Sequence, residues 1–175
     1  MENLITFISK FEGIIGAILG TVATLITTQL LKGLGKIKFY FYDFDIEYYG
    51  ENEHGITAII EDISKAEECN YKFRLQLYNS SEIIKVLKDF QIEFILENKS
   101  IFNKPNNENE IIKHEIYCKY KDFNAINIQP KQLIEINMSG GIKHENMIEF
   151  SKVKKVYFIA KNHKNRKIKK LIKKF

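Results

Sequence analysis

One long uncharged segment near the N-terminus constrains this chain more than any other feature. From Gly13 to Leu31 the sequence GIIGAILGTVATLITTQLL runs for 19 residues without a charged side chain. As an α-helix it would be about 28 Å long, close to the roughly 30 Å hydrocarbon core of a bilayer. A core helix of a soluble protein usually keeps a polar stripe, and here Gln29 is the only strongly polar residue. The sequence therefore predicts one transmembrane helix over about residues 12–32, inside an N-terminal segment of residues 1–35.

A cleaved signal peptide fits this segment poorly. The uncharged run is longer than a typical signal-peptide core, and its N-terminal flank carries Lys10 between Glu2 and Glu12 instead of a basic cluster. No pair of small residues follows the run, because Leu31 and Lys32 come next. The segment is therefore expected to stay in the protein as an anchor in the cell membrane.

The lysines on either side of the anchor predict its orientation. Lys10 alone precedes the uncharged run, whereas Lys32, Lys36 and Lys38 follow it. Segments rich in lysine and arginine stay on the cytoplasmic side of a membrane. We therefore expect the C-terminal domain to be cytoplasmic.

Small residues form a stripe along one face of the predicted helix. Gly16, Gly20, Thr24 and Thr28 recur every four residues. Such a face lets two helix backbones approach closely in lipid. The stripe predicts a homo-oligomer that assembles through the transmembrane helix.

Beyond Gly35 the pattern changes to short strands. Residues 71–78 are the clearest case, because apolar and polar side chains alternate there with a period of two. The sequence NKPNNENE at 103–110 predicts an exposed loop, and Gly140-Gly141 predicts a tight turn. The predicted strands lie within residues 36–49, 56–60, 71–78, 90–96, 112–120, 126–128, 133–138 and 153–160. Seven to nine strands over residues 36–160 predict a mainly β domain, a β-sandwich or alternatively a small β-barrel.

Two stretches of this domain resemble a known kind of module. FRLQLYNSSEIIKVLKDFQIEFI, from Phe73 to Ile95, is similar to the paired central strands of small Ig-like modules, and INIQPKQLIEINM, from Ile126 to Met138, is similar to a later strand pair. Small single-pass bacterial membrane proteins with one Ig-like β-sandwich share this layout. The resemblance implies an Ig-like fold and provides no catalytic residues. The chain has no tryptophan, so the core tryptophan of antibody domains is absent.

Positive charge is concentrated in the last 15 residues. Residues 161–175 hold eight basic side chains and no acidic ones, whereas the other 160 residues carry 19 basic and 22 acidic groups, a net charge of −3. The eight are Lys161, Lys164, Arg166, Lys167, Lys169, Lys170, Lys173 and Lys174. Residues 161–175 are therefore expected to form a separate basic amphipathic tail on a slightly acidic domain.

The spacing of apolar residues in this tail predicts a short helix. Ile168, Leu171, Ile172 and Phe175 stand at i, i+3, i+4 and i+7, so one helical face would be apolar. Lysines beside such a face are typical of helices on anionic lipid. Nucleic acid is the less favoured partner, because no aromatic residues are interleaved for reading bases. The expected membrane-surface residues are Lys164, Arg166, Lys167, Ile168, Lys169, Lys170, Leu171, Ile172, Lys173, Lys174 and Phe175.

No catalytic, metal-binding or nucleotide-binding motif is evident. His54, His114, His144 and His163 form no HExxH or comparable pattern. Asp43, Asp45 and Glu47 alternate along one predicted strand and are expected to form a solvated edge near the membrane. We therefore expect no enzyme activity, no catalytic or metal-ligating residues and no cofactor. Cys69 and Cys118 are expected to be reduced, partly buried thiols.

Two functions fit these observations. The first is a membrane-tethered, non-enzymatic β-sandwich that binds a protein partner. The alternative is a membrane-acting effector of bacterial antiphage defence, whose β domain senses a small ligand such as a cyclic nucleotide and clusters the transmembrane helix. A filled, convex sandwich would favour the first, and a concave basic pocket would favour the second.

Overall fold

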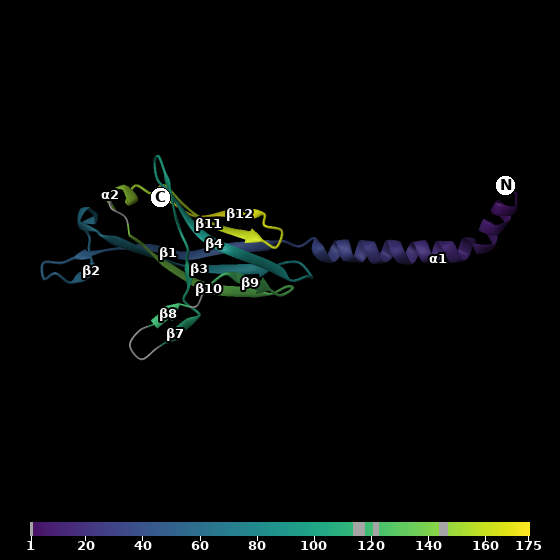
Figure 1. Ribbon diagram of the computed structural model, residues 1–175, viewed down its shortest axis with the longest axis horizontal. Coiled ribbons are helices and arrows are strands. Elements are labelled where there is room, and N and C mark those ends of the chain that lie inside the picture. The colour runs from purple at the N-terminus through teal and green to yellow at the C-terminus, as the bar shows by residue number, and fades with distance from the viewer. Residues whose placement is uncertain (1, 114–117, 121–122, 144–146) are drawn as a thin grey trace.

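A long helix and a β-sandwich make up the computed structural model, which describes residues 2–113, 118–120, 123–143 and 147–175. The helix α1 (Glu2–Gly33) extends away from the sandwich (Figure 1). Within it, Phe11–Gly33 is long and apolar enough to cross a membrane, and none of its most apolar window is buried against the rest of the chain. The helix therefore adds nothing to the core of the sandwich.

Sheet A, the first of the two large sheets, has the strand order β2-β1-β3-β10-β6, and every neighbouring pair is antiparallel. The strands are β1 (Ile37–Glu51), β2 (Thr57–Ile59), β3 (Glu68–Asn79), β6 (Asn106–Asn107) and β10 (Leu133–Lys143). The long strand β3 lies at its centre. A single turn of 3₁₀-helix, Ile63–Lys65, precedes β3.

Sheet B has the order β12-β11-β4-β5, with β9 also paired to β4, again antiparallel. Its strands are β4 (Lys85–Ile95), β5 (Ser100–Asn103), β9 (Ala125–Ile128), β11 (Lys155–Asn162) and β12 (Lys167–Lys174). A separate hairpin, β7 (Ile111–Lys113) with β8 (Cys118–Tyr120), projects from the sandwich, and the short helix α2 (Met147–Phe150) precedes β11 (Figure 1).

The two large sheets enclose one aromatic-rich core. In β3 every second side chain, from Cys69 to Leu77, is buried, as the period of two predicts. Phe158 of β11 occupies the centre, with its ring centroid 5.9 Å from that of Phe39, 5.8 Å from Phe41 and 6.0 Å from Phe90. The predicted β-sandwich is confirmed.

Two irregular aspartates keep apolar residues on the core side of long strands. Asp43 in β1 and Asp89 in β4 have φ angles of 54° and 55°, a region that aspartate tolerates better than most residues. Each sits where the pairing register shifts. After the shift at Asp43, Phe44 and Ile46 continue to pack on the core, as Phe41 does before it. The break in alternation at Asp89 explains why the sequence predicts a strand only from Phe90, although β4 begins at Lys85.

Twelve strands lie within the described residues, against seven to nine expected. Apart from β12, which takes the place of the predicted C-terminal helix, additional strands such as β5 and β6 are two to four residues long. Segments this short show no measurable periodicity, and only their pairing with neighbouring strands defines them.

The predicted C-terminal helix is wrong, because Lys167–Lys174 form strand β12 along the edge of β11. Ile168 and Ile172, expected to face lipid, pack against the core. Leu171 and Phe175 are exposed, although the Phe175 ring lies against Phe44 at 6.3 Å. A spacing of i and i+4 fits both a helix and one face of a strand, so the pattern could not separate them. The tail forms a strand and not a helix because it can pair with the otherwise unpaired edge of the buried strand β11.

Three residues, Leu34–Lys36, join α1 to β1, and the β3–β4 loop holds them in place. The amide of Glu82 donates to the Lys32 carbonyl at 3.1 Å, and Ser80 exchanges backbone and hydroxyl hydrogen bonds of 2.9–3.0 Å with Lys36. Gly35 passes so close to this loop that a Cβ there would lie 2.2 Å from backbone atoms of Ser81. The helix is therefore joined to the sandwich by a close-packed junction.

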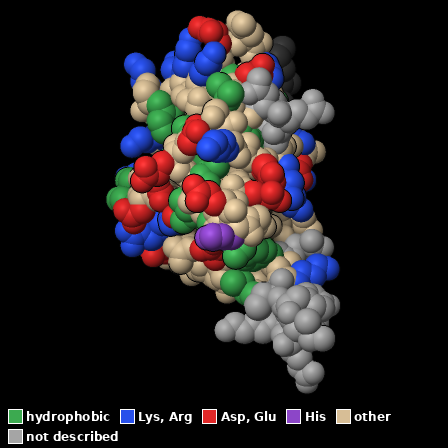
Figure 2. Space-filling model, turned by 90° about the vertical axis from the view of Figure 1, so that its left-hand side faces the viewer, with side chains coloured by type: hydrophobic (Ala, Val, Ile, Leu, Met, Phe, Trp, Pro, Cys, Tyr) green, Lys and Arg blue, Asp and Glu red, His purple; other side chains and the backbone are tan. Residues whose placement is uncertain are grey.

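The end of the sandwich far from α1 faces the viewer in Figure 2. Lysine, aspartate and glutamate side chains alternate there with a few apolar ones. This end consists of the β1–β2 turn, the segment before β3 and the loops beside α2. It carries charges of both signs.

Candidate binding surface

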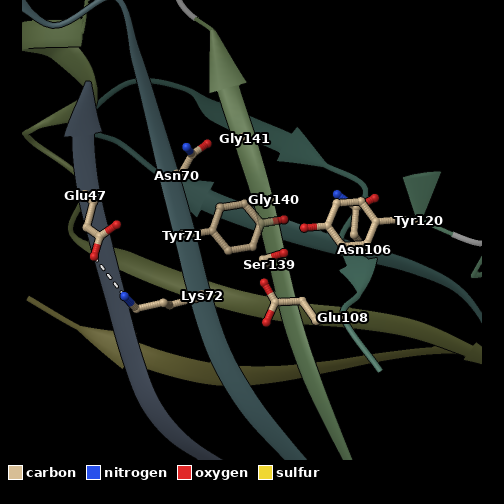
Figure 3. Close-up of a pocket in the computed structure, with 10 residues that line it drawn as sticks. All are labelled: Glu47, Asn70, Tyr71, Lys72, Asn106, Glu108, Tyr120, Ser139, Gly140 and Gly141. Carbon is tan, nitrogen blue, oxygen red and sulfur yellow. Dashed lines mark hydrogen bonds and ion pairs between the residues drawn. The ribbon is translucent and has the colours of Figure 1, made fainter. Parts of the chain in front are cut away.

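A hollow of about 280 Å³ lies on the outer face of sheet A, beside the β7–β8 hairpin (Figure 3). It brings together residues from five segments far apart in the sequence. They are Glu47 of β1, Asn70, Tyr71 and Lys72 of β3, Asn106 and Glu108 of and beside β6, Tyr120 of β8, and Ser139, Gly140 and Gly141 of β10. In Figure 3 Glu47 and Lys72 lie on one side of β10, and Asn106, Glu108 and Tyr120 on the other.

Two glycines shape the floor of this hollow. A Cβ at Gly140 would lie 2.4 Å from the Tyr71 hydroxyl, and one at Gly141 would lie 2.8 Å from the Asn70 side-chain oxygen. Tyr71 is buried and donates its hydroxyl to Asn103 Oδ1 at 2.7 Å, so its ring cannot move aside freely. The tight turn predicted at Gly140-Gly141 is wrong, because both residues lie inside β10. Glycine is required there by close packing and not by a turn.

The charged side of the hollow is an ordered network of opposite charges. Lys72 Nζ lies 2.8 Å from Glu47 Oε1 and 3.5 Å from an Asp45 oxygen, and the Tyr49 hydroxyl donates to Glu47 at 2.9 Å. The hydrogen bond from Lys72, followed by that from Tyr49, lowers the pKa of Glu47, and the same bond raises the pKa of Lys72. Both shifts favour the ionised forms of Glu47 and Lys72, so these two side chains present fixed charges at neutral pH.

The three alternating carboxylates of β1 form ion pairs across the sheet, and their position near a membrane remains a prediction. Asp43 accepts from Arg74 at 2.8 Å, and Asp45 and Glu47 share Lys72. All three lie on the open face of sheet A, each beside a cation of β3. Such cross-strand pairs stabilise a sheet modestly and leave little free charge for a cation.

Asparagine side chains cover the free edge of β10. Asn109 Oδ1 accepts from the Asn137 amide at 3.1 Å, its Nδ2 donates to the Glu135 carbonyl at 3.3 Å, and Asn103 Nδ2 donates to the Gly141 carbonyl at 2.9 Å. The segment 103–110, expected to be only an exposed loop, therefore protects a sheet edge. Because these backbone groups are occupied, a partner would meet side chains here instead of adding a strand.

The residues expected to pack between helices lie exposed on α1. A Cβ at Gly16 or Gly20 would touch nothing within 4 Å. Thr24 donates its hydroxyl to the Gly20 carbonyl at 2.8 Å, which satisfies it without water. The stripe that ends at Thr28 is thus open to a second helix, and self-association remains a prediction.

The expected tail residues do not gather at one surface. Lys164 and Arg166 lie in the β11–β12 turn at the α1 end, whereas Lys173 and Lys174 pair with Val156 and Lys155 at the far end. Over its eight residues a strand spans about 25 Å, more than two Debye lengths at physiological salt. The tail therefore cannot place all its charge on one membrane surface if α1 stands upright in the bilayer. His54 and His163 lie at opposite ends of the sandwich, and His114 and His144 are outside the described residues.

Cys69 is a free thiol with no exposed surface. Burial, with a smaller contribution from the Glu68 carboxylate, raises the pKa of Cys69 to about 12. A thiol held in this protonated form is a poor nucleophile, so Cys69 has a packing role. The side chain of Cys118 is outside the described residues.

The buried thiol predicts a loss of stability in alkaline solution. Below pH 9 the thiol is protonated in both the folded and the unfolded chain, so its contribution is complete. Above pH 9 only the unfolded chain releases the proton, and the free energy of unfolding should fall by about 4 kcal/mol by pH 12. Urea unfolding from pH 8 to pH 11 would measure how the free energy of unfolding changes with pH. The two proteins compared are Cys118→Ser and the double variant Cys69→Ala/Cys118→Ser. Equal slopes in the two proteins would contradict the prediction.

Comparison with known proteins found a matching family model and a relative that covers most of the chain. Residues 35–173 match a family model described as the YopI Ig-like domain. The SPbeta prophage-derived uncharacterized protein YopI of Bacillus subtilis strain 168 is 34% identical over 166 residues, which cover 93% of each chain. Among solved structures, an ApaA protein from Bordetella pertussis has 6% identity and a TM-score of 0.37, over 81% of this chain and 91% of its own. The structural genomics target SoR45 has 10% identity and a TM-score of 0.37, over 79% and 83% of the two chains.

Proposed function

The chain belongs to the YopI Ig-like domain family, and from that premise we propose that it is a membrane-tethered, non-enzymatic module that binds a protein partner. The observation that carries this proposal is the contrast between α1 and the sandwich. The sandwich closes a complete core without α1, while the apolar window of α1 has no buried residue. An apolar surface of this size is unstable in water and requires lipid or protein around it.

The orientation proposed from the flanking lysines gains support from the fold. The end of the sandwich at α1 adds Lys85, Lys131, Lys164 and Arg166 to Lys36, with Glu82 as an acidic residue of the β3–β4 loop. Such an end suits the negatively charged cytoplasmic leaflet. We therefore propose a single-pass protein of the cell membrane with its Ig-like domain in the cytoplasm.

The hollow on sheet A is the surface proposed to receive the partner. It lies away from α1, and its lining combines Tyr120, amide groups of asparagine and the charges of Glu47, Lys72 and Glu108. Mixed polar and aromatic surfaces of this kind are typical of protein recognition. Asp43, Asp45 and Glu47 of β1 are each paired with a cation of β3, which favours binding over catalysis.

Photo-crosslinking in membrane fractions tests both parts of the proposal. The chain with p-benzoylphenylalanine at Glu108 should remain in the pellet after carbonate washing and form a covalent adduct with a second protein. The same probe at Lys173, on the far edge of sheet B, should form no adduct. Deletion of residues 1–35 should release a folded domain into the soluble fraction. A full-length chain that stays soluble without detergent contradicts the anchor, and equal adducts from both positions contradict the proposed surface.

A further inference from the structure

Four connecting segments meet where α1 joins the sandwich. The α1–β1 junction contacts the β3–β4 loop, and the Lys131 amide and ammonium of the β9–β10 turn donate to the carbonyls of Ser81 and Ser80 at 3.3 and 2.9 Å. The β11–β12 turn reaches the same end, because Asn162 pairs with Leu87, close to the start of β4. Figure 1 shows this turn on the α1 side and the C-terminus on the opposite side.

A second hollow, of about 300 Å³, lies among these segments. Four basic side chains from four different elements line it: Lys36 of the junction, Lys85 of β4, His163 of the β11–β12 turn and Lys170 of β12. Its apolar walls include Phe39 and Ile168. The hollow therefore combines a cationic rim with a hydrocarbon lining.

The charge of this rim is not neutralised by carboxylates of the described residues. Other lysines of the sandwich do form ion pairs: Lys72 with Glu47, Lys161 with Asp89 and Lys169 with Glu93. Lys36, Lys85, His163 and Lys170 have no such ion pair within 4 Å among the residues described. Lys170 Nζ instead lies 5.8 Å from the centroid of the Phe39 ring, and both residues line the hollow.

The nearby C-terminus of α1 does not cancel this positive potential. A helix C-terminus carries partial negative charge on its unpaired carbonyls. Here the Lys85 ammonium donates to the Gly33 carbonyl at 3.2 Å, and the Glu82 amide donates to that of Lys32. With those carbonyls occupied, the rim remains favourable for an anion.

Apolar residues flank the hollow on the side of the helix. Leu34, Ile83 and Ile84 are exposed, with 69%, 40% and 51% of their surfaces accessible. If α1 crosses a bilayer, this end meets the headgroup layer, where exposed aliphatic side chains next to lysines are stable. The same arrangement would be unfavourable in free solution.

We propose that the hollow formed by Lys36, Lys85, His163 and Lys170 binds the phosphate of an anionic phospholipid headgroup. The proposal rests on the membrane anchoring proposed above, which places the hollow at lipid depth. A bound headgroup would hold the sandwich upright on the membrane. In this proposal lipid binds at the α1 end of the domain, and not along the whole basic tail of residues 161–175. Free phosphate and cyclic dinucleotides carry the same phosphate chemistry, so the test must separate the sources.

Binding to the full chain in neutral detergent micelles tests the site directly. The ligands are dihexanoylphosphatidylglycerol, dihexanoylphosphatidylcholine, inorganic phosphate, cyclic di-GMP and a short DNA duplex, each followed by microscale thermophoresis. We expect saturable binding of the phosphatidylglycerol alone. Lys36→Gln/Lys85→Gln should weaken it about tenfold or more, given the attraction of each lysine for anionic headgroups. Lys173→Gln/Lys174→Gln removes the same charge at the far end of β12 and should leave the affinity unchanged.

The other outcomes of this binding assay either contradict the site or identify a different ligand. Because Lys85 also bonds to the helix, Lys36→Gln/Lys170→Gln serves as a second variant that leaves the Gly33 contact intact. An equal loss in the Lys173/Lys174 control, or equal binding of phosphatidylcholine, overturns the site. Tighter binding of phosphate or cyclic di-GMP identifies a soluble ligand, and tight binding of DNA identifies nucleic acid. The assay does not depend on where the chain resides in cells, so failure of the anchor would appear only in the carbonate wash.

Discussion

Deletion of residues 167–175 should remove a large part of the stability of the sandwich. The truncated chain loses β12, and with it the core contacts of Ile168 and Ile172, worth about 1–2 kcal/mol each at partial burial. It also leaves Glu93, which is buried and lies 2.5 Å from Lys169, without its cation, a loss of about 3 kcal/mol. The sum of about 5–7 kcal/mol compares with a total of roughly 5–15 kcal/mol for a domain. Urea unfolding followed by circular dichroism would measure it.

A variant that loses two lysines but keeps the strand tests whether the strand itself, and not the charge at its end, is needed for stability. Lys173→Ser/Lys174→Ser keeps β12 and should unfold close to the parent midpoint, because both side chains are exposed. The truncated chain should also aggregate, since the edge of β11 becomes unpaired. If truncation leaves the unfolding midpoint unchanged, β12 is dispensable and a detached lipid-binding tail becomes the better description.

Gly35→Ala should disrupt the junction between α1 and the sandwich. The added methyl group would lie 2.2 Å from the Ser81 backbone, and a backbone cannot yield as a flexible side chain can. We expect a loss of about 3 kcal/mol in the free energy of unfolding, at the upper end for overpacked sites. Protease cleavage after Lys36, now protected by its hydrogen bonds to Ser80, should become faster.

Gly33→Ala is the matched control two residues away. A Cβ there would meet only the end of Ile83 at 4.0 Å, and alanine favours the last turn of a helix. This variant should change the free energy of unfolding by less than about 1 kcal/mol, in the stabilising direction. Equal effects of the two substitutions would show that the close approach at Gly35 does not limit stability.

Sequence reasoning predicted correctly the elements whose apolar residues fit only one kind of secondary structure. β3 alternates cleanly, and its buried residues from Tyr71 to Leu77 are those that the alternation predicts. The predicted helix of residues 12–32 lies within α1, whose Phe11–Gly33 stretch is long and apolar enough to cross a membrane. The tail failed because Ile168 and Ile172 fit two periods equally, and only the unpaired edge of β11 resolves the choice.

Neither hollow could be assembled from the sequence, because each depends on long-range pairing. The first draws on positions from Glu47 to Gly141, and the second on Lys36, Lys85, His163 and Lys170. A local signal was present only at Gly140-Gly141, and a glycine pair inside a strand reads first as a turn. The lysines gave no signal of their own, since lysine is frequent throughout the chain.

Because of the close-packed junction, a rotation of α1 about its axis should rotate the sandwich with it. Only Leu34–Lys36 separate the helix from β1, and the hydrogen bonds of Lys32 and Lys36 to the β3–β4 loop restrict rotation about this connection. Each residue of a helix advances by 100° around its axis, so the face that carries Gly16 and Gly20 has a fixed azimuth relative to the hollow on sheet A. Two chains paired through that face would therefore present their two hollows at one defined angle. A partner protein with two binding sites would then be selected by the spacing and angle of those sites as well as by the contacts of each one.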